Sequence, residues 1–76
     1  MRYFFDIHQD DECIPDEEGM IFPNVEAAQE EAATSLADLA REMVRERAAH
    51  HVAIAVRDVH GPIVDTTFAW TVQRRH

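Results

Sequence analysis

The chain contains no lysine, a single cysteine and only two glycines among its 76 residues. Cys13 therefore has no internal disulfide partner, and no cysteine and histidine spacing resembles a zinc motif. Two glycines are too few for a glycine-rich loop that cradles phosphate groups. These absences argue against a disulfide-stapled scaffold, a zinc finger and a nucleotide-binding loop, and we expect no cofactor.

Long apolar runs are absent too. No run approaches the roughly 20 residues that span a bilayer, and the N-terminus lacks the apolar core and cleavage site of a secretory signal. Apolar residues still make up 46% of the chain, too many for a disordered tail. We expect a single globular domain over residues 1–76, located in the cytoplasm, and small enough at 8.7 kDa that a partner subunit would add stability.

Negative charge predominates, and the formal net charge is −8. A field of this sign repels nucleic acid and anionic membranes, so we expect neither as a partner. The charge is unevenly placed: residues 1–40 carry eleven acidic residues against Arg2 alone, whereas residues 41–76 carry six arginines against four acidic residues. The sequence is therefore electrically polarised along its length.

The strongest periodic signal predicts a long helix over residues 25–47. Its apolar side chains fall within about 60° of one line at 100° per residue. Asn24 precedes it and is a good N-cap, because its side-chain oxygen can accept a free backbone N–H of the first turn. Glutamates crowd the start and arginines the end, which complements the helix dipole.

Alternating residues predict strands over 2–8, 51–58 and 63–73, and punctuation places a short strand at 19–22. Gly61, in the loop before the last strand, can take a positive φ. The result is a single α+β domain of ββαββ order, one mixed or antiparallel sheet of three to four strands packed on one long helix. A right-handed crossover from the first hairpin would set the third strand parallel beside the first, in order 2-1-3-4. The predicted core comprises Tyr3, Phe5, Ile7, Phe22, Val25, Ala28, Ala32, Leu36, Leu39, Met43, Val52, Ile54, Val56, Val64, Phe68, Trp70 and Val72.

Three stretches carry a resemblance to a known family. They are Arg2-Tyr3-Phe4-Phe5-Asp6, Asp16-Glu17-Glu18-Gly19, and Ala27-Ala28 with Glu31-Ala32. With them, the chain resembles a family of short uncharacterised bacterial proteins classed as a domain of unknown function. The resemblance implies a fold and no activity. Many relatives carry a glycine in the first acidic turn, where this chain has Asp10-Asp11-Glu12.

A weaker likeness is to HicB-type antitoxin domains. Their strands precede a helix that follows an apolar-proline segment, here Ile21-Phe22-Pro23. The resemblance implies an acidic antitoxin whose segment 6–18 masks a small basic ribonuclease toxin. The shared feature is one of topology, which by itself carries no function.

The acidic segment 6–18 also raises the alternative of a metal-binding protein or metal-dependent hydrolase. Calcium takes six to eight oxygens from closely spaced carboxylates. An EF-hand register that starts at Asp6 fails, because His8 occupies its third position and Asp11 stands where glycine is needed. We therefore favour a solvated loop and predict no metal-binding residue.

The histidines and the cysteine are the candidates for catalytic or metal-binding groups. His50 and His51 are adjacent and would diverge on a strand, and His60 lies in a distant turn. Cys13 with His8 could act as a nucleophile and base, but no third group orients the imidazole. We predict no catalytic residue and no enzyme.

The sheet face opposite the helix is the most suggestive surface. It carries small and moderately apolar residues, which would let a second sheet or helix approach closely. We predict a non-enzymatic protein-interaction or regulatory module, possibly a homodimer, that uses this face or a sheet edge. The candidate interaction residues are Phe4, Ala53, Ala55, Ile63, Ala69 and Thr71.

Overall fold

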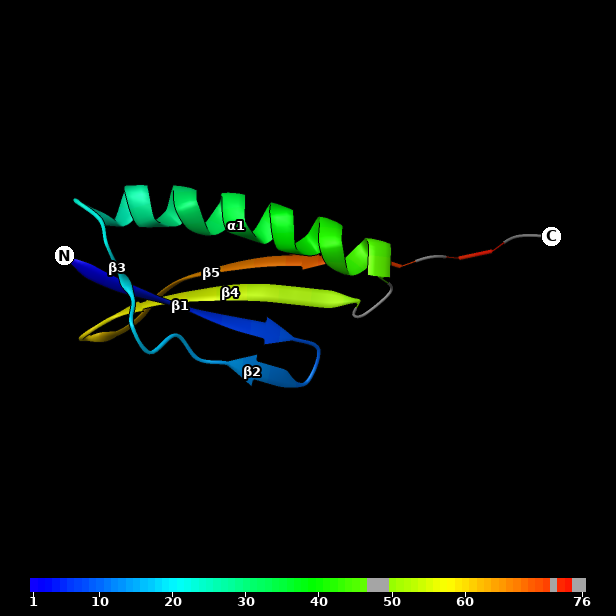
Figure 1. Cartoon of the computed structure of the whole chain (residues 1–76), viewed down its shortest axis with the longest axis horizontal. Helices are drawn as coiled ribbons and strands as arrows, with labels where there is room; N and C mark the ends of the chain where they lie inside the picture. The colour runs from blue at the N-terminus through cyan, green and yellow to red at the C-terminus, as the bar shows by residue number, and fades with distance from the viewer. Residues whose placement is uncertain (47–49, 72, 75–76) are drawn as a thin grey trace.

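A computed structural model of the chain describes residues 1–46, 50–71 and 73–74. Within these ranges five strands form an antiparallel sheet, and one helix lies along one of its faces (Figure 1). The elements in chain order are β1 (Arg2–Gln9), β2 (Glu12–Ile14), β3 (Met20–Ile21), α1 (Val25–Glu46), β4 (His51–Asp58) and β5 (Gly61–Ala69). The sheet order is β2-β1-β4-β5, with β3 also paired to β1. The predicted α+β architecture is confirmed.

The predicted parallel pairing of the first strand with the strand after the helix is wrong. β1 and β4 are antiparallel, with Phe4 opposite Arg57 and Gln9 opposite Val52. The crossover through α1 starts from β3, which is itself antiparallel to β1. β3 and β4 therefore run in the same direction with β1 between them. The prediction assigned this parallel relationship to β1 and β4 instead of β3 and β4.

Local sequence signals set the ends of α1 and β5. The side-chain oxygen of Asn24 accepts the N–H of Ala27 at 2.9 Å and caps the helix, as predicted. The predicted last helical residue, Arg47, lies outside the described residues. β5 ends at Ala69, short of the predicted residue 73, where its partner strand β4 begins at His51.

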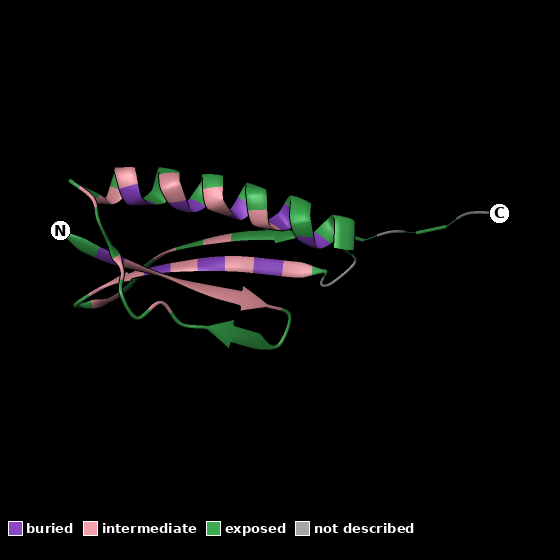
Figure 2. Cartoon of the chain, viewed as in Figure 1, coloured by how far each residue is buried: buried purple, intermediate pink, exposed green. Residues whose placement is uncertain are grey.

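The core lies between α1 and β4. Alternate residues of β4 point at the helix, and Val52, Ile54 and Val56 are at most 2% exposed (Figure 2). Ala28 and Ala32 on the helix are fully buried, since their small side chains let the helix approach the sheet closely. The remaining buried residues are Tyr3, Leu36, Ala40 and Met43.

Two residues depart from the predicted core. Ala40 is buried although it was not predicted, and Phe68 is 43% exposed although it was. Phe68 belongs to β5, the strand at the edge of the sheet, where the helix covers its side chain incompletely. Val72, also predicted in the core, lies outside the described residues.

Both hairpin turns use a positive φ. Gly61 takes φ 123° at the start of β5, as predicted. Between β1 and β2, Asp10 takes φ 51°, whereas the φ of Asp11 is not positive. A positive φ at only the first central residue is the pattern of a type II′ hairpin turn, which favours glycine at that position. The chain thus places an aspartate where the resembling family often has glycine.

Replacing Asp10 with glycine is expected to raise the free energy of unfolding by about 0.5–1 kcal/mol, because glycine adopts positive φ without the steric cost of a Cβ. Urea unfolding followed by circular dichroism measures the change. Asp11→Gly is the matched control, since the same replacement at a residue without positive φ only adds chain entropy to the unfolded state. Equal effects of the two variants would contradict the strain explanation.

Candidate functional site

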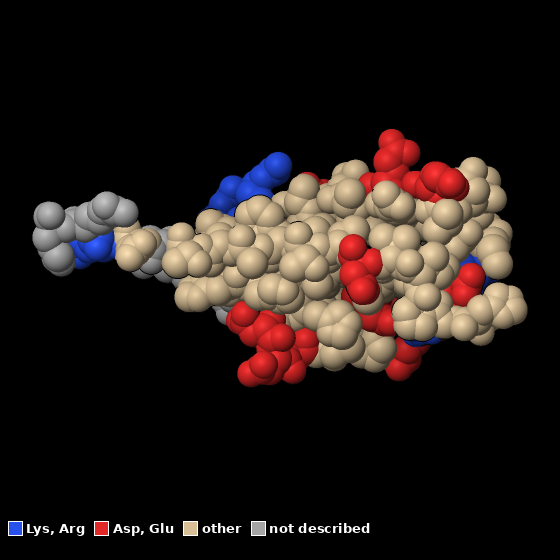
Figure 3. Space-filling model, turned by 180° about the vertical axis from the view of Figure 1, so that it is seen from behind, with Lys and Arg blue, Asp and Glu red and all other residues tan. Residues whose placement is uncertain are grey.

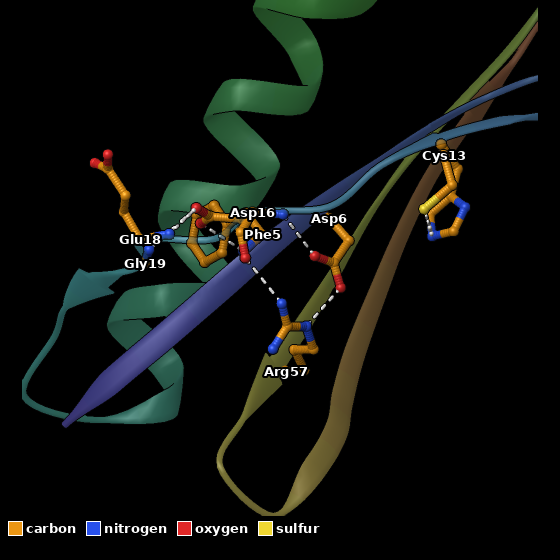
Figure 4. Close-up of polar contacts among 8 residues, drawn as sticks. Phe5, Asp6, Cys13, Asp16, Glu18, Gly19 and Arg57 are labelled. Atoms are coloured by element: carbon orange, nitrogen blue, oxygen red, sulfur yellow. Dashed lines mark hydrogen bonds and ion pairs between the residues drawn. The ribbon is translucent and has the colours of Figure 1, made fainter.

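A polar clasp joins three segments that are far apart in the sequence (Figure 4). Arg57 on β4 donates from Nε to Asp6 Oδ2 on β1 at 2.8 Å, and from Nη2 to the backbone oxygen of Asp16 at 2.8 Å. The other oxygen of Asp6 accepts the backbone N–H of Asp16 at 2.9 Å. One arginine and one carboxylate therefore hold the loop before β3 against the middle of the sheet.

Asp16 also fills a gap at the edge of β1. β2 pairs with residues 7–9 of β1 and β3 pairs with residues 2–3, so the edge between them has no strand partner among the described residues. Asp16 Oδ2 accepts the N–H of Phe5 there at 3.1 Å. Its other oxygen accepts the N–H groups of Glu18 at 3.1 Å and Gly19 at 3.0 Å. A carboxylate thus replaces the missing strand.

These contacts perturb the acidity of Asp16. Burial favours the neutral acid and by itself raises the pKa of Asp16. The hydrogen bonds from the N–H groups of Gly19, Phe5 and Glu18, together with the positive charge of Arg57, favour the carboxylate and outweigh burial. The net result is a pKa below the usual 3.8. Asp16 is therefore held charged by the fold itself.

Gly19 completes the clasp on the other side. It takes φ 73°, and a Cβ there would lie 2.8 Å from the backbone oxygen of Tyr3. Arg2 reaches the same loop and donates to the backbone oxygen of Glu18 at 2.6 Å. Close approach of the loop to β1 therefore requires a residue without a side chain at position 19.

Apart from Arg57, the clasp is built from two of the stretches that distinguish the sequence. Arg2, Phe5 and Asp6 come from the opening stretch, and Asp16, Glu18 and Gly19 come from the acidic one. A family model described as "Domain of unknown function (DUF6894)" matches residues 2–69. The chain belongs to this family. No curated protein and no solved structure matches the chain.

The acidic stretch of this DUF6894 domain is thus only partly the solvated loop that was predicted. Asp6 and Asp16 are half-buried and hydrogen-bonded, whereas Asp10, Asp11 and Glu17 are exposed. Within the described residues no group of three or more histidine, cysteine, aspartate or glutamate side chains is arranged to hold a metal ion. From the sequence alone, the mixture of acidic and turn residues in this stretch does not show which carboxylates pack inward.

The structure brings Cys13 and His8 together, as the sequence allowed. They are opposite each other on β2 and β1, and the sulfur lies 3.9 Å from Nε2 of the imidazole. Cys13 is exposed, and in the described part of the chain no third side chain bonds to the imidazole. A nucleophile needs an oriented base, and no hydrogen bond from the described side chains orients this one.

The predicted interaction face is less apolar than its residue list suggests. Ala53 and Ala55 are half-buried on β4, but the residues opposite them on β1 are His8 and Asp6. The guanidinium of Arg57 covers the ring of Phe4, with 4.5 Å from Cζ to the ring centre.

The other three predicted residues are exposed and lie towards the β5 side. Ile63 is 41% exposed, Ala69 is the last residue of β5, and Thr71 follows it. The structure therefore divides the six residues between a polar centre and an exposed strand. Their role in binding stays a prediction.

A different surface, missed in the sequence, lies on the helix-facing side of the sheet at the β5 margin. An apolar groove of about 320 Å³ separates the second half of α1 from β5. Val44 and Phe68 are 44% and 43% exposed there. The groove is lined by Ala37, Ala40, Arg41, Val44 and Phe68. The signal in the sequence was the apolar sector of α1, which extends around the helix to Ala37 and Val44 and is wider than the core requires.

Proposed function

We propose that this DUF6894 domain is a small non-enzymatic protein-interaction module that binds its partner along the outer edge of β5. The observation that supports the proposal is the free edge of this strand beside the apolar groove. Within the described residues α1 is not apolar enough along its length to cross a membrane. No described cluster supplies a base-activated nucleophile or a set of metal ligands.

The backbone groups that β5 presents outward can be identified. Among the described strands, β5 pairs with β4 alone. Just beyond the strand, Trp70 donates its N–H to His50 at 3.1 Å, which fixes the direction of the backbone groups at position 70. Directions alternate along a strand, so Phe68, Thr66 and Val64 bond to β4 while Ala69, Thr67 and Asp65 point away from it. Ile63 is the extra residue of the bulge, where this alternation is interrupted. Residues 65, 67 and 69 form a row of donors and acceptors that have no partner among the described residues.

An unpaired row of this length is unusual in a protein that works alone. Natural proteins protect edge strands with lysines, inward charges or very short strands. β5 has nine residues and one charged side chain, Asp65. Pro62 interrupts only its beginning, at the bulge near Arg57. The central and final parts of the strand stay open to pairing.

The groove supplies apolar contacts next to this edge. When a partner strand is added to a sheet, backbone hydrogen bonds give affinity and neighbouring pockets receive alternate side chains. Phe68 is an aromatic anchor on the helix-facing side of β5, and Val44 is an aliphatic neighbour. In Figure 1, β1 passes in front of β4, and β5 lies on the other side of β4. β5 is therefore on the side seen from behind in Figure 3, where a broad band of surface is largely free of charged side chains.

The edge can be tested with Thr67→Pro. This change removes an N–H that points outward and leaves the hydrogen bonds to β4 in place. The matched control is Cys13→Pro at the opposite sheet edge. The β1 residues Ile7 and Gln9 bond to Ile14 and Glu12, so the N–H of Cys13 points outward from β2.

We expect Thr67→Pro to reduce the amount of partner retained at least tenfold, because it removes one or two backbone hydrogen bonds and disturbs the ones next to them. The tagged wild type and both variants are compared by quantitative mass spectrometry of proteins retained from native cell extract, and circular dichroism confirms folding. Proteins retained equally by all three chains would contradict the proposal. Selective loss with Cys13→Pro would instead favour the HicB-like alternative, in which the acidic segment 6–18 binds a basic toxin.

A further inference from the structure

We infer that the edge of β5 pairs with a second copy of this chain, antiparallel, about a twofold axis that passes through Thr66. The inference rests on the proposed function and names its partner. It follows from the direction of the backbone groups, the residues that each register would set opposite one another, and the side chains beside the edge.

Hydrogen bonding restricts the registers. Beyond the bulge the outward groups belong to residues 65, 67 and 69, so a symmetric antiparallel pair must join odd-numbered residues to odd-numbered residues. The twofold axis then passes through a residue rather than between two residues. An axis at Thr67 pairs only residues 65–69, and an axis at Val64 brings Pro62 and the bulge near Arg57 into the new ladder and leaves Phe68 unpaired. Axes at Asp65 and Thr66 keep most of it paired.

Charge decides between these two registers. An axis at Asp65 places that carboxylate directly opposite its own copy, and like charges opposite each other destabilise a strand pair. An axis at Thr66 places Asp65 of one copy opposite Thr67 of the other. At both symmetry-related positions, the single charged residue of the strand then lies opposite a neutral polar side chain.

The same axis matches the apolar side chains. On the helix-facing side, Val64 of one copy lies opposite Phe68 of the other, which is a favourable pair of a β-branched and an aromatic residue. On the open side, Ile63 lies opposite Ala69. Three of these four residues are exposed in the single chain, so pairing covers apolar surface that is otherwise in water.

The helices add to the interface. In the joined sheet both copies of α1 lie on the same side, each with its groove turned towards the shared margin. The groove carries two alanines, Ala37 and Ala40, whose small side chains permit close approach, and Val44 beside Phe68. The groove carries Arg41 and the strand Asp65. These charges are opposite in sign, so the net charge of the chain does not oppose pairing at this margin.

The size of the surface sets the expected strength. In this register residues 63–69 lie opposite one another and extend about 23 Å, and one strand plus one packed layer is about 15 Å high. The strip covers on the order of 350 Å² per copy, or about 700 Å² in total, which is the size of a weak, transient interface. We therefore expect a reversible dimer with a dissociation constant in the micromolar range.

Two substitutions at one position test the register by sign. Thr67→Asp places a carboxylate opposite Asp65 of the other copy, and Thr67→Lys places an ammonium group there. Each change acts twice because of the symmetry. We expect the aspartate to raise the dimer dissociation constant about threefold to thirtyfold and the lysine to lower it by a similar factor. Sedimentation equilibrium over a concentration series into the high micromolar range measures all three chains.

A cross-link tests the axis directly. In a Cys13→Ser background, Thr66→Cys sets two sulfurs on the axis, where opposite Cα atoms of a non-hydrogen-bonded pair are about 4.5 Å apart. Under mild oxidation we expect a disulfide-linked dimer. Asp65→Cys is the control, since its two copies lie diagonally, about 9 Å apart, which is beyond the reach of a disulfide.

The outcomes separate the inference from the proposed function. A chain that stays monomeric at high micromolar concentration overturns the dimer and leaves the β5 edge to another protein, which Thr67→Pro tests independently. A dimer that Thr67→Pro does not weaken overturns both. A dimer that Thr67→Lys weakens, or that cross-links through residue 65 instead of 66, overturns the register and with it the inference.

Discussion

Asp16→Ala is expected to lower the free energy of unfolding by about 2–3 kcal/mol. The change leaves the N–H groups of Phe5, Glu18 and Gly19 without their carboxylate acceptor, and hydrogen bonds to a charged group contribute about 1.5–3 kcal/mol each before solvent takes their place. A chain of 76 residues has a total stability of only about 4–11 kcal/mol. Urea unfolding followed by circular dichroism measures the loss.

Glu17→Ala is the matched control for this prediction. Glu17 is the next acidic residue in the chain and is exposed, so its removal changes the net charge equally without touching the clasp. We expect no measurable loss of stability from it. If Asp16→Ala and Glu17→Ala behaved alike, the clasp would contribute nothing, and relief of charge repulsion in the acidic segment would be the dominant effect.

The pH dependence of the same variants separates charge from shape. The pKa of Asp16 is lower in the folded chain than its usual 3.8, so its carboxylate stabilises the fold at any pH above about 4. That contribution is lost as the pH falls through the folded pKa. Asp16→Asn cannot ionise, so the stability difference between wild type and this variant should shrink between about pH 5 and pH 3. A difference that stays constant over this range would show that the charge plays no part.

Much of the fold could be predicted because its signals are local. The apolar stripe of α1 and the cap at Asn24 lie within one continuous segment, and so does the alternation of β4. The antiparallel pairing of β1 and β4 was missed because it depends on the direction of β3, the strand that leads into the helix. β3 has only two residues, too few for an alternation pattern to establish its direction.

The clasp and the β5 edge were beyond local signals. Arg57 reaches Asp6 across 51 positions of sequence, and no local pattern in either segment indicates that the two residues are in contact. Phe68 alternates with its neighbours as a core residue should, but its exposure depends on how far α1 extends over the last strand. Tertiary placement of the helix, rather than any property of residues 61–69, leaves this side of the sheet uncovered.

The stretches that mark the DUF6894 family are therefore explained by the fold. Arg2, Asp6, Asp16 and Gly19 bond to or approach one another and attach the loop to β1. The β5 edge and its groove use none of them. The residues of the clasp and those of the proposed binding surface are therefore separate sets.

Gly19→Ala is expected to lower the free energy of unfolding by about 2–3 kcal/mol, for two separate reasons. A non-glycine residue at φ 73° costs about 1–2 kcal/mol. The added Cβ would also lie 2.8 Å from the backbone oxygen of Tyr3 and 3.0 Å from side-chain atoms of Arg2 and Phe4. The side chains can move, but Tyr3 is paired with Met20 in the sheet and its oxygen cannot. Thermal and urea unfolding together measure the loss.

Gly19→Asn distinguishes the two causes. Asparagine tolerates a positive φ better than alanine, so a loss caused by backbone strain alone would be largely rescued by this variant. A loss caused by the contact with Tyr3 would not be, because asparagine carries the same Cβ. We expect no rescue, and we expect proteolysis of both variants to begin in the loop before β3, since the displaced Cβ separates residues 15–19 from the strand that Asp16 and Arg57 hold them against. Full recovery with asparagine would mean that the loop has room at position 19 and that the clasp tolerates a side chain there.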